Sequence, residues 1–376
     1  MANIIASPTR YIQGKGELQN LRQHVEMLGK KLFILTTASG QARVAPAINA
    51  SVAGSDCTAV YEPFHGECSQ SEIDRVVADF QASGCDLIVG VGGGKITDLA
   101  KAVGEVAHLG AVNIPTSAST CAPFTCMSVM YTAEGGKLRS WRFDHEIDAV
   151  YMDLDVIASC PIRYNAAGVM DAMAKKIEML NGQPEMHLED TPIDVYTAYN
   201  MAAYVYGVLD EIALQAIEDN RRHEVTKALT DMAFLNVITT GVIANTTKSF
   251  RQSELAHVIY DGVRTHFTHE AAEAIHGEIV AVGLFCQLYF NGLKDKEDEL
   301  REFMRKMDLP LTLGELGIEP TDCTVFEDLL VGMRSAKSVG MRVWAMHDDS
   351  SDADWPAICG LADGVMFDFH DAPAVL

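Results

Sequence analysis

Short runs rich in β-branched residues alternate with helical patterns along roughly the first 160 residues. The apolar runs that predict strands lie at 31–36, 57–61, 86–92, 111–115 and 149–153. Between two of them, a helix is predicted because apolar residues recur at i, i+3, i+4 and i+7, namely Ile73, Val76, Val77 and Phe80. Strand and helix in alternation indicate a parallel sheet with helices on its faces.

The pattern changes after Pro161. Long segments rich in Ala, Met and Leu, such as 201–220 and 225–246, contain few β-branched runs and predict helices. A chain of 376 residues also exceeds the size at which one core usually stops growing. We therefore predict an N-terminal α/β domain over 1–161 and an all-helical domain over 162–376. The last forty or so residues mix turn formers and acids, and no element is assigned to them.

The excess of acidic residues disfavours some classes of binding partner. Fifty-two acidic against 29 basic residues give a formal net charge of −23, which repels nucleic acid backbones and anionic lipids. We expect a small-molecule substrate, with no nucleic acid or membrane partner, and a homo-oligomer. The chain has no signal-peptide pattern, no unbroken run of about 18 apolar residues and no CxxC pair. A cytoplasmic protein with reduced thiols is therefore expected.

A glycine-rich loop at 90–95 follows a predicted strand and opens a helix at 96–107. Glycines let an anion approach the backbone amides, and the helix start adds its dipole. The loop is neither the dinucleotide fingerprint, because Lys95 replaces the third glycine, nor a Walker loop, because Val89 and Ile96 do not match that pattern. An ordinary strand-to-helix turn is the alternative.

Four of the 12 histidines cluster within a short segment, as His257, His266, His269 and His276. Two imidazoles and one carboxylate, with positions left open, suit zinc or ferrous iron as a Lewis acid. Asp171 offers the carboxylate, because small residues lie on the same predicted helical face and no other charge occurs from Asn165 to Met173. A solvated surface acid is the alternative reading of Asp171.

Small hydroxyl residues fill the segment 116–131, which follows the predicted strand 111–115. Such side chains bind a cofactor's ribose or amide, although an ordinary Ser/Thr loop has the same composition. The end of the early strand, at 35–40, lacks the acid that usually binds the ribose of NAD, and Arg43 is nearby. Both NAD and NADP therefore stay open.

These features together resemble the iron-containing alcohol dehydrogenase and glycerol dehydrogenase superfamily. The glycine triplet is followed by Asp98 and then Ala100 and Lys101, as in the family's signature. The family's metal-ligand segments are matched by Gly168-Val-Met-Asp171-Ala, Ala256-His257-Val-Ile259 and His276-Gly277-Glu278. The segments 64–74 and 116–131 match as well, so the resemblance covers about the first 320 residues.

The resemblance implies a dinucleotide-binding first domain and a metal-binding second domain. For the dinucleotide it implies Gly92, Gly93, Gly94, Lys95, Thr116, Ser119, Thr125, Met127 and Tyr131. For zinc, or alternatively ferrous iron, it implies Asp171, His257 and His276, which are also the catalytic set. His266 and His269 match no family ligand, and Tyr260 replaces a second histidine that the family often has.

One departure concerns the substrate. Glycerol dehydrogenases have an aspartate where this chain has Cys121, and a neutral thiol is a poor polyol acceptor. The segment around Cys121 resembles the hydroxycarboxylate dehydrogenase branch, which implies 2-oxo or 2-hydroxy acids.

We therefore predict a metal-dependent NAD(P)-linked oxidoreductase that transfers a hydride between the nicotinamide and a small polyol or hydroxy acid. Ser119 or a bound water is the candidate proton relay. The first alternative is a 2-hydroxycarboxylate dehydrogenase acting as a 2-oxo acid reductase. A dehydroquinate-synthase-like lyase is less favoured because no basic cluster is evident around the ligands. The retained ligands disfavour a non-catalytic cofactor-binding sensor.

Overall fold

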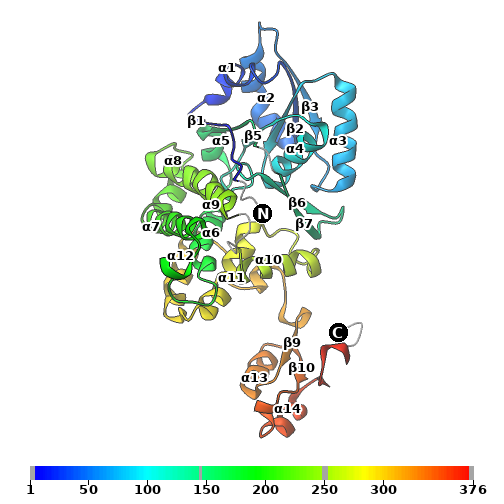
Figure 1. The fold of residues 1–376 in the computed structure, drawn as a ribbon, viewed down its shortest axis with the longest axis vertical. Helices are drawn as coiled ribbons and strands as arrows, with labels where there is room; N and C mark the ends of the chain where they lie inside the picture. Colours follow the sequence, from blue (N-terminus) through cyan, green and yellow to red (C-terminus); the bar gives the residue numbers. More distant parts are fainter. Residues whose placement is uncertain (1–4, 144–145, 248–252, 372–376) are drawn as a thin grey trace. The chain divides into compact units, whose positions relative to one another are not determined.

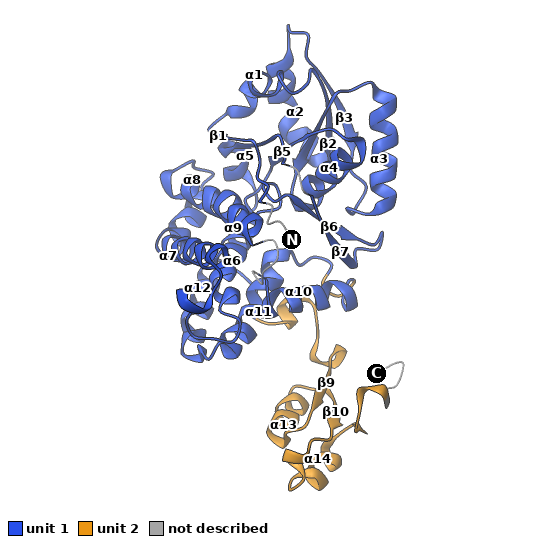
Figure 2. Ribbon diagram, viewed as in Figure 1, with its two compact units in different colours: residues 1–268, 272–311 blue, residues 269–271, 312–376 orange. Residues whose placement is uncertain are grey.

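The computed structural model describes residues 5–143, 146–247 and 253–371. The chain forms two compact units (Figure 2). Unit 1 comprises residues 1–268 and 272–311, and unit 2 comprises 269–271 and 312–376. The boundary predicted at residue 161 lies inside unit 1, where the sheet gives way to helices.

A six-stranded parallel sheet, in the order β1-β8-β5-β4-β2-β3, forms the first part of unit 1 (Figure 1). Its strands are β1 (Arg10–Gly14), β2 (Lys31–Thr36), β3 (Thr58–Pro63), β4 (Leu87–Gly92), β5 (Ala111–Pro115) and β8 (Ala149–Asp153). The five runs predicted from the sequence are all strands of this sheet. The sixth strand, β1, was not predicted, because it is a short half-buried edge strand that pairs with β8 from far away in the chain.

Alternating strand residues supply two apolar faces, and both are covered by helices. Leu32 and Ile34 of β2 pack in one core cluster with α2 (Ala38–Val52), whereas Phe33 of β2 packs in another with α3 (Gln70–Ser83) and α4 (Gly94–Ala107). In α3, the predicted apolar face is buried at Ile73, Val76 and Phe80. The doubly covered parallel sheet predicted from alternation is therefore confirmed.

An antiparallel hairpin of β6 (Met127–Tyr131) and β7 (Lys137–Arg142) was not predicted. It contains the end of the hydroxyl-rich segment, for which the sequence predicts cofactor-binding side chains and no strand, because small hydroxyl residues give no strand pattern.

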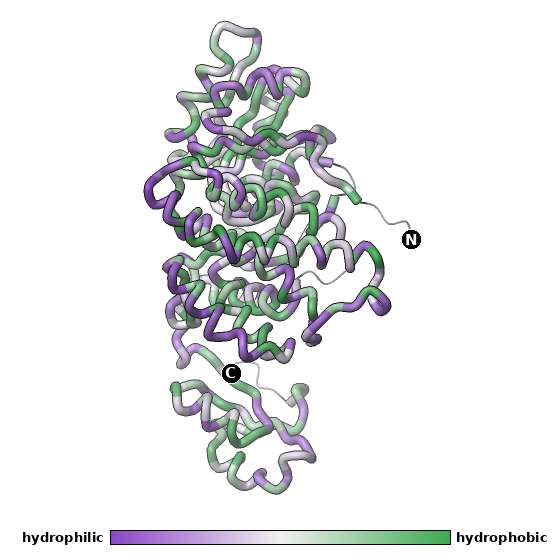
Figure 3. The backbone as a smooth tube through the Cα atoms, turned by 90° about the vertical axis from the view of Figure 1, so that its left-hand side faces the viewer, coloured by the Kyte–Doolittle hydropathy of each residue, from purple (hydrophilic) through white to green (hydrophobic). Residues whose placement is uncertain are grey.

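Helices form the rest of unit 1. They are α1 (Leu21–Val25), α5 (Leu154–Ser159), α6 (Ile162–Met179), α7 (Ile193–Arg221), α8 (Lys227–Phe234), α9 (Thr240–Thr246), α10 (Leu255–His266), α11 (His276–Phe290) and α12 (Glu297–Lys306). A π-helical turn at Leu235–Thr239 joins α8 to α9. Colouring by the hydropathy of each residue shows hydrophilic and hydrophobic positions alternating along the helical turns of the backbone (Figure 3). Helix α6 packs against both α7 and α11, so its side chains are almost all buried.

One segment, Lys227–Thr246, is long and apolar enough to cross a membrane by length and composition alone. Because 67% of its apolar window is buried inside the protein, it has the character of a core helix.

Unit 2 corrects the prediction of helices up to residue 376. It contains a three-stranded parallel sheet, in the order β11-β10-β9, and two helices. Its elements are β9 (Thr324–Glu327), α13 (Leu330–Ser338), β10 (Arg342–Met346), α14 (Trp355–Leu361) and β11 (Gly364–Met366). Each strand is short and is defined by pairing with its neighbour in the sheet, and the core of Met333, Val343 and Ile358 packs the helices on β10, so local pattern did not reveal these strands. Residues 372–376 of the unassigned tail lie outside the described residues.

Replacing Gly168 tests the close packing of α6 against the backbone at Ala118. A Cβ atom at Gly168 would lie 1.8 Å from the carbonyl oxygen of Ala118. We expect Gly168→Ala to lower the free energy of unfolding by about 3 kcal/mol, because backbone must shift to relieve the overlap. Gly207→Ala is the matched control, because a Cβ there meets nothing within 4 Å and Gly207 is exposed inside α7. That variant should gain about 0.5–1 kcal/mol from helix propensity. Chemical denaturation followed by circular dichroism measures both, and equal effects would contradict the packing argument.

Candidate functional site

A cavity of about 760 Å³ opens in unit 1 where the glycine loop and the hydroxyl-rich segment face α6, α10 and α11. Every site residue predicted from the sequence lines it. They are Gly92, Gly93, Gly94, Lys95, Thr116, Ser119, Cys121, Thr125, Met127, Tyr131, Asp171, His257 and His276. Folding therefore brings residues from three distant parts of the chain to one cavity.

The glycine loop joins the fully buried strand β4 to the start of α4. A Cβ at Gly92 would lie 2.4 Å from Ile96 Cδ1, so a larger residue there would force the Ile96 side chain to move. A Cβ at Gly93 would meet nothing within 4 Å. Gly93 is the N-cap of α4, and no side chain caps that helix start. The loop thus leaves space for an anionic group beside the helix N-terminus.

The aspartate and lysine that follow the glycines have a structural role. Lys101 Nζ lies 2.8 Å from Asp98 Oδ1 and donates hydrogen bonds to the carbonyl oxygens of Ala122, Thr125 and Met127. Burial raises the pKa of Asp98, and the charge of Lys101 partly opposes that rise. The pair therefore fixes the hydroxyl-rich segment against α4, next to the glycine loop.

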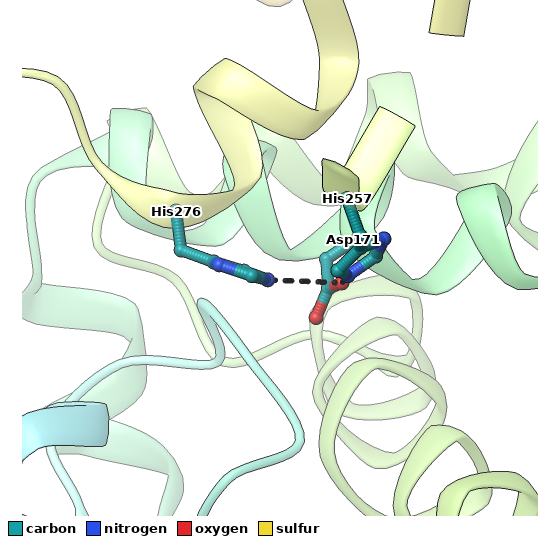
Figure 4. A group of neighbouring side chains, drawn as sticks. All are labelled: Asp171, His257 and His276. Carbon is teal, nitrogen blue, oxygen red and sulfur yellow. Dashed lines mark ion pairs between the residues drawn. The ribbon is translucent and has the colours of Figure 1, made fainter. Parts of the chain in front are cut away.

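Asp171, His257 and His276 converge from α6, α10 and α11 (Figure 4). The Nε2 atoms of both histidines lie 3.5 Å from Asp171 Oδ1. One donor atom from each of the three residues lies within 4.8 Å of the others. This donor set matches the carboxylate and imidazole ligands of zinc or ferrous iron.

Glu178 orients His257. Its Oε2 atom lies 2.6 Å from His257 Nδ1, and its Oε1 atom accepts hydrogen bonds from the backbone amides of His257 and Glu254. The carboxylate is fully buried, and although burial opposes ionisation, the interactions with His257 and the charge of Lys175 together outweigh burial and lower the pKa of Glu178. Because Nδ1 faces an acceptor, the hydrogen-bond network assigns the proton to Nδ1 and leaves the Nε2 lone pair facing Asp171.

The surroundings of Asp171 fit a cation. Burial alone would raise its pKa, but the adjacent Lys175 ammonium and the interactions with His257 and His276 together outweigh burial and hold the pKa of Asp171 well below its ordinary value. Its Oδ1 atom is buried and accepts no hydrogen bond from any described residue. Two imidazole nitrogens and Lys175 Nζ, 3.6 Å away, surround that oxygen. A metal ion fits the residues present.

Tyr260 packs against His276, one of the candidate metal ligands. Its ring meets the His276 ring edge-on, with centroids 4.3 Å apart, and its hydroxyl lies 2.8 Å from the Tyr131 hydroxyl. Tyr260 therefore links the hairpin to a candidate ligand.

The cavity has a different charge from the protein as a whole. Among the described residues that line it, six are basic: Arg43, Lys95, Lys137, Arg142, Lys175 and Arg264. Three are acidic: Asp98, Asp171 and Asp261. The expectation of no basic cluster is corrected here, because these bases come from separate segments and only the fold gathers them.

Other predicted positions fit their environments. His266 and His269 are exposed and take no part in the group around Asp171. Burial raises the pKa of the Cys121 thiol to about 12, so this residue is neutral near pH 7.

Two residues of the site, Lys175 and Glu178, were not predicted from the sequence. They lie four and seven residues after Asp171, a spacing that puts all three on one face of a helix and could have indicated them.

Comparison with known proteins gives consistent matches. Residues 8–150 match the family model of iron-containing alcohol dehydrogenase. A glycerol dehydrogenase of Citrobacter freundii is 30% identical over 333 residues, covering 85% of this chain and 86% of that protein. A glycolaldehyde reductase of Halobacterium salinarum is 29% identical over 326 residues, with 85% and 86% covered.

Two further matches bear on the substrate and the fold. Hydroxycarboxylate dehydrogenase A of Escherichia coli is 28% identical over 323 residues, covering 84% of this chain and 86% of that one. The crystal structure of a probable glycerol dehydrogenase from Sinorhizobium meliloti superposes with a TM-score of 0.74 at 29% identity, covering 86% of this chain and 88% of that chain.

Replacing Lys101 tests whether the buried Asp98–Lys101 pair fixes the hydroxyl-rich segment against α4. We expect Lys101→Met to lower the free energy of unfolding by about 3–5 kcal/mol, because it leaves the Asp98 carboxylate buried without its cation. Adding Asp98→Asn should recover part of that loss. Lys30→Met, which breaks the exposed pair with Asp56, is the control and should leave the melting temperature nearly unchanged. Thermal denaturation compares wild type, Lys101→Met, the double variant and Lys30→Met. A melting temperature of Lys101→Met equal to that of wild type would contradict this role of the pair.

Proposed function

The chain belongs to the iron-containing alcohol dehydrogenase family, and on that premise we propose that it transfers a hydride between a nicotinamide dinucleotide and a small polyol or hydroxy acid. It is an oxidoreductase that acts on CH–OH groups. The observation that carries the proposal is that the candidate ligands and the glycine loop line one cavity. A cytoplasmic homo-oligomer is part of the same proposal.

The metal is proposed to be zinc, with ferrous iron as the alternative, held by Asp171, His257 and His276. Support comes from the buried Asp171 Oδ1 atom that lacks a hydrogen bond and from the Glu178 carboxylate that orients His257. When they are bound, the metal supplies a Lewis acid for the substrate oxygen and the dinucleotide supplies the hydride donor or acceptor.

The dinucleotide is proposed to bind along the carboxyl edge of the sheet. Open space at Gly93 and the uncapped start of α4 suit its pyrophosphate. For the rest of the cofactor we propose Lys95, Thr116, Ser119, Thr125, Met127 and Tyr131. In this structure Lys95 forms an ion pair with Glu67, so its ammonium is already oriented at the cavity wall.

The chain's own residues then position the reaction. Lys101 fixes the hydroxyl-rich segment, and Glu178 keeps the His257 lone pair directed at the site. Ser119 accepts a hydrogen bond from Ser117 and lines the cavity, which supports its candidacy as a proton relay.

The substrate has two candidates. A polyol follows from the glycerol dehydrogenases among the relatives. A 2-hydroxy or 2-oxo acid is favoured by the neutral Cys121 and by the excess of bases in the cavity lining. A polyol and a 2-hydroxy acid both carry a CH–OH group that oxidation converts to a carbonyl, and a 2-oxo acid is the carbonyl form of the latter, so the same hydride transfer serves both classes.

NADP is a second candidate for the cofactor. Thr37, Ser39, Gly40 and Arg43, at the carboxyl end of β2 and the start of α2, line the cavity without any carboxylate among them. A hydroxyl-rich, basic site suits a 2′-phosphate, whereas NAD-binding proteins usually have an acid there.

Removing a ligand tests the metal proposal. We expect wild-type protein to hold about one zinc or iron per chain, and Asp171→Asn or His276→Ala to bind it at least 100-fold more weakly and to lose activity. Metal content is measured by elemental analysis after dialysis, and activity by dinucleotide absorbance. His266→Ala is the control, because this exposed histidine is not in the site. Full metal retention in Asp171→Asn would refute the ligand set.

Replacing Arg43 tests cofactor choice. If Arg43 recognises a 2′-phosphate, Arg43→Ala should lower the ratio of kcat/KM for NADPH to that for NADH by about 10-fold or more, because one charge-assisted contact is lost. Steady-state kinetics with both cofactors measures the ratio. An unchanged ratio would show that Arg43 does not recognise the 2′-phosphate.

A further inference from the structure

Lys175 is a buried lysine whose charge the proposed chemistry does not use. It lies one helical turn after Asp171 on α6, its side chain is only 4% exposed, and it lines the cavity. Its ammonium lies 3.3 Å from His257 Nε2, 3.6 Å from Asp171 Oδ1 and 3.5 Å from Ser253 Oγ.

Two of these three neighbours are the atoms that a metal ion would take. A cation held by His257 and Asp171 would use the lone pairs that face Lys175 and would repel its ammonium. Only the neutral Ser253 hydroxyl then stays with Lys175 among the described contacts. A buried ammonium without an anionic partner is costly, so the loaded site favours an anion at Lys175.

The cavity wall offers no other carboxylate for this purpose. Of the acids that line it in the described part of the chain, Asp98 is paired with Lys101 and Asp261 with Lys137. Cys121 also lines the cavity, and its thiol is neutral near pH 7. The Glu178 carboxylate also raises the pKa of Lys175 by its charge, but it is bound by His257 and by the backbone amide of Glu254 and does not line the cavity. An anion that reaches Lys175 through the cavity therefore has to come from the ligand.

We propose that Lys175 is the residue that binds the carboxylate of a 2-oxo or 2-hydroxy acid substrate. This inference rests on the proposed function, because it presumes that the reacting oxygen faces the metal ligands. A carboxylate on the neighbouring carbon is then close to the same site, and Lys175 contacts two of the three ligands. Lys175 thus selects hydroxy acids over polyols.

A matched substrate pair tests the selection. Pyruvate and hydroxyacetone have the same carbon skeleton and ketone, and differ in a carboxylate against a hydroxymethyl group. Lys175→Met should lower the ratio of kcat/KM for pyruvate to that for hydroxyacetone by about 30- to 100-fold, mainly through KM, because a charged hydrogen bond is lost. Lys175→Arg should restore part of the ratio. An unchanged ratio in Lys175→Met overturns the proposal.

The adjacent lysine provides the control. Lys176 lies on another face of α6, with its ammonium 4.2 Å from the centre of the Tyr206 ring, and it does not line the cavity. Lys176→Met removes the same charge one residue away and should leave the pyruvate-to-hydroxyacetone ratio as in wild type. A ratio that falls equally in both variants would reflect net charge and would overturn the proposal.

Cys121→Asp gives a second variant if Lys175→Met does not fold. A carboxylate at position 121 gives Lys175 an internal partner, so the same ratio should fall by at least about 10-fold. A ratio that stays the same or rises in Cys121→Asp overturns the proposal.

Equilibrium binding separates this proposal from the proposed function. Oxamate, an unreactive carboxylate analogue of pyruvate, should bind the zinc-loaded protein with NADH, with a Kd about 30-fold weaker in Lys175→Met, measured by fluorescence of the bound dinucleotide. Wild-type protein that reduces hydroxyacetone but neither binds oxamate nor reduces pyruvate would overturn the role of Lys175 alone. Lysine-dependent oxamate binding without turnover of any substrate would instead overturn the proposed function.

Discussion

The Asp171 carboxylate, buried in α6 among two imidazoles and an ammonium, is the constraint on which the rest of the site depends. An ionised acid inside a protein needs compensating charge, and here Lys175 supplies it in the structure while His257 and His276 face the same oxygen. The close packing of α6 at Gly168 and the hydrogen bonds of Glu178 keep these groups in place. The site is therefore built by helix packing as much as by its ligands.

The lining of this cavity is mainly basic, whereas the protein as a whole is strongly acidic. The chain has a formal net charge of −23, which would disfavour anions near its exterior. Among the residues that the structure describes, twice as many bases as acids line the cavity, six against three, and the loop at Gly93 adds the start of a helix. An anionic cofactor and, as we infer, an anionic substrate are accommodated because the field inside a cleft depends on its own lining. Net charge alone would have given the opposite expectation.

Much of this was readable from the chain. Alternating apolar runs predicted five strands of the main sheet, and the glycine loop, the hydroxyl-rich segment and the three ligand motifs all line one cavity. The missed elements share one cause. Strand β1, the β6–β7 hairpin and the strands of unit 2 are short, and each becomes a strand only through pairing with a partner segment.

The sequence by itself determined the class of fold, the family and the chemical types of the ligands, because periodicity and motif spacing are properties of neighbours along the chain. Only the tertiary structure decided that Lys175 contacts the candidate ligands Asp171 and His257, that Lys101 fixes the hydroxyl-rich segment against α4 and that bases from five separate segments line one cavity. Electrostatic interactions depend on distance through space, and no local pattern records which distant charges folding brings together.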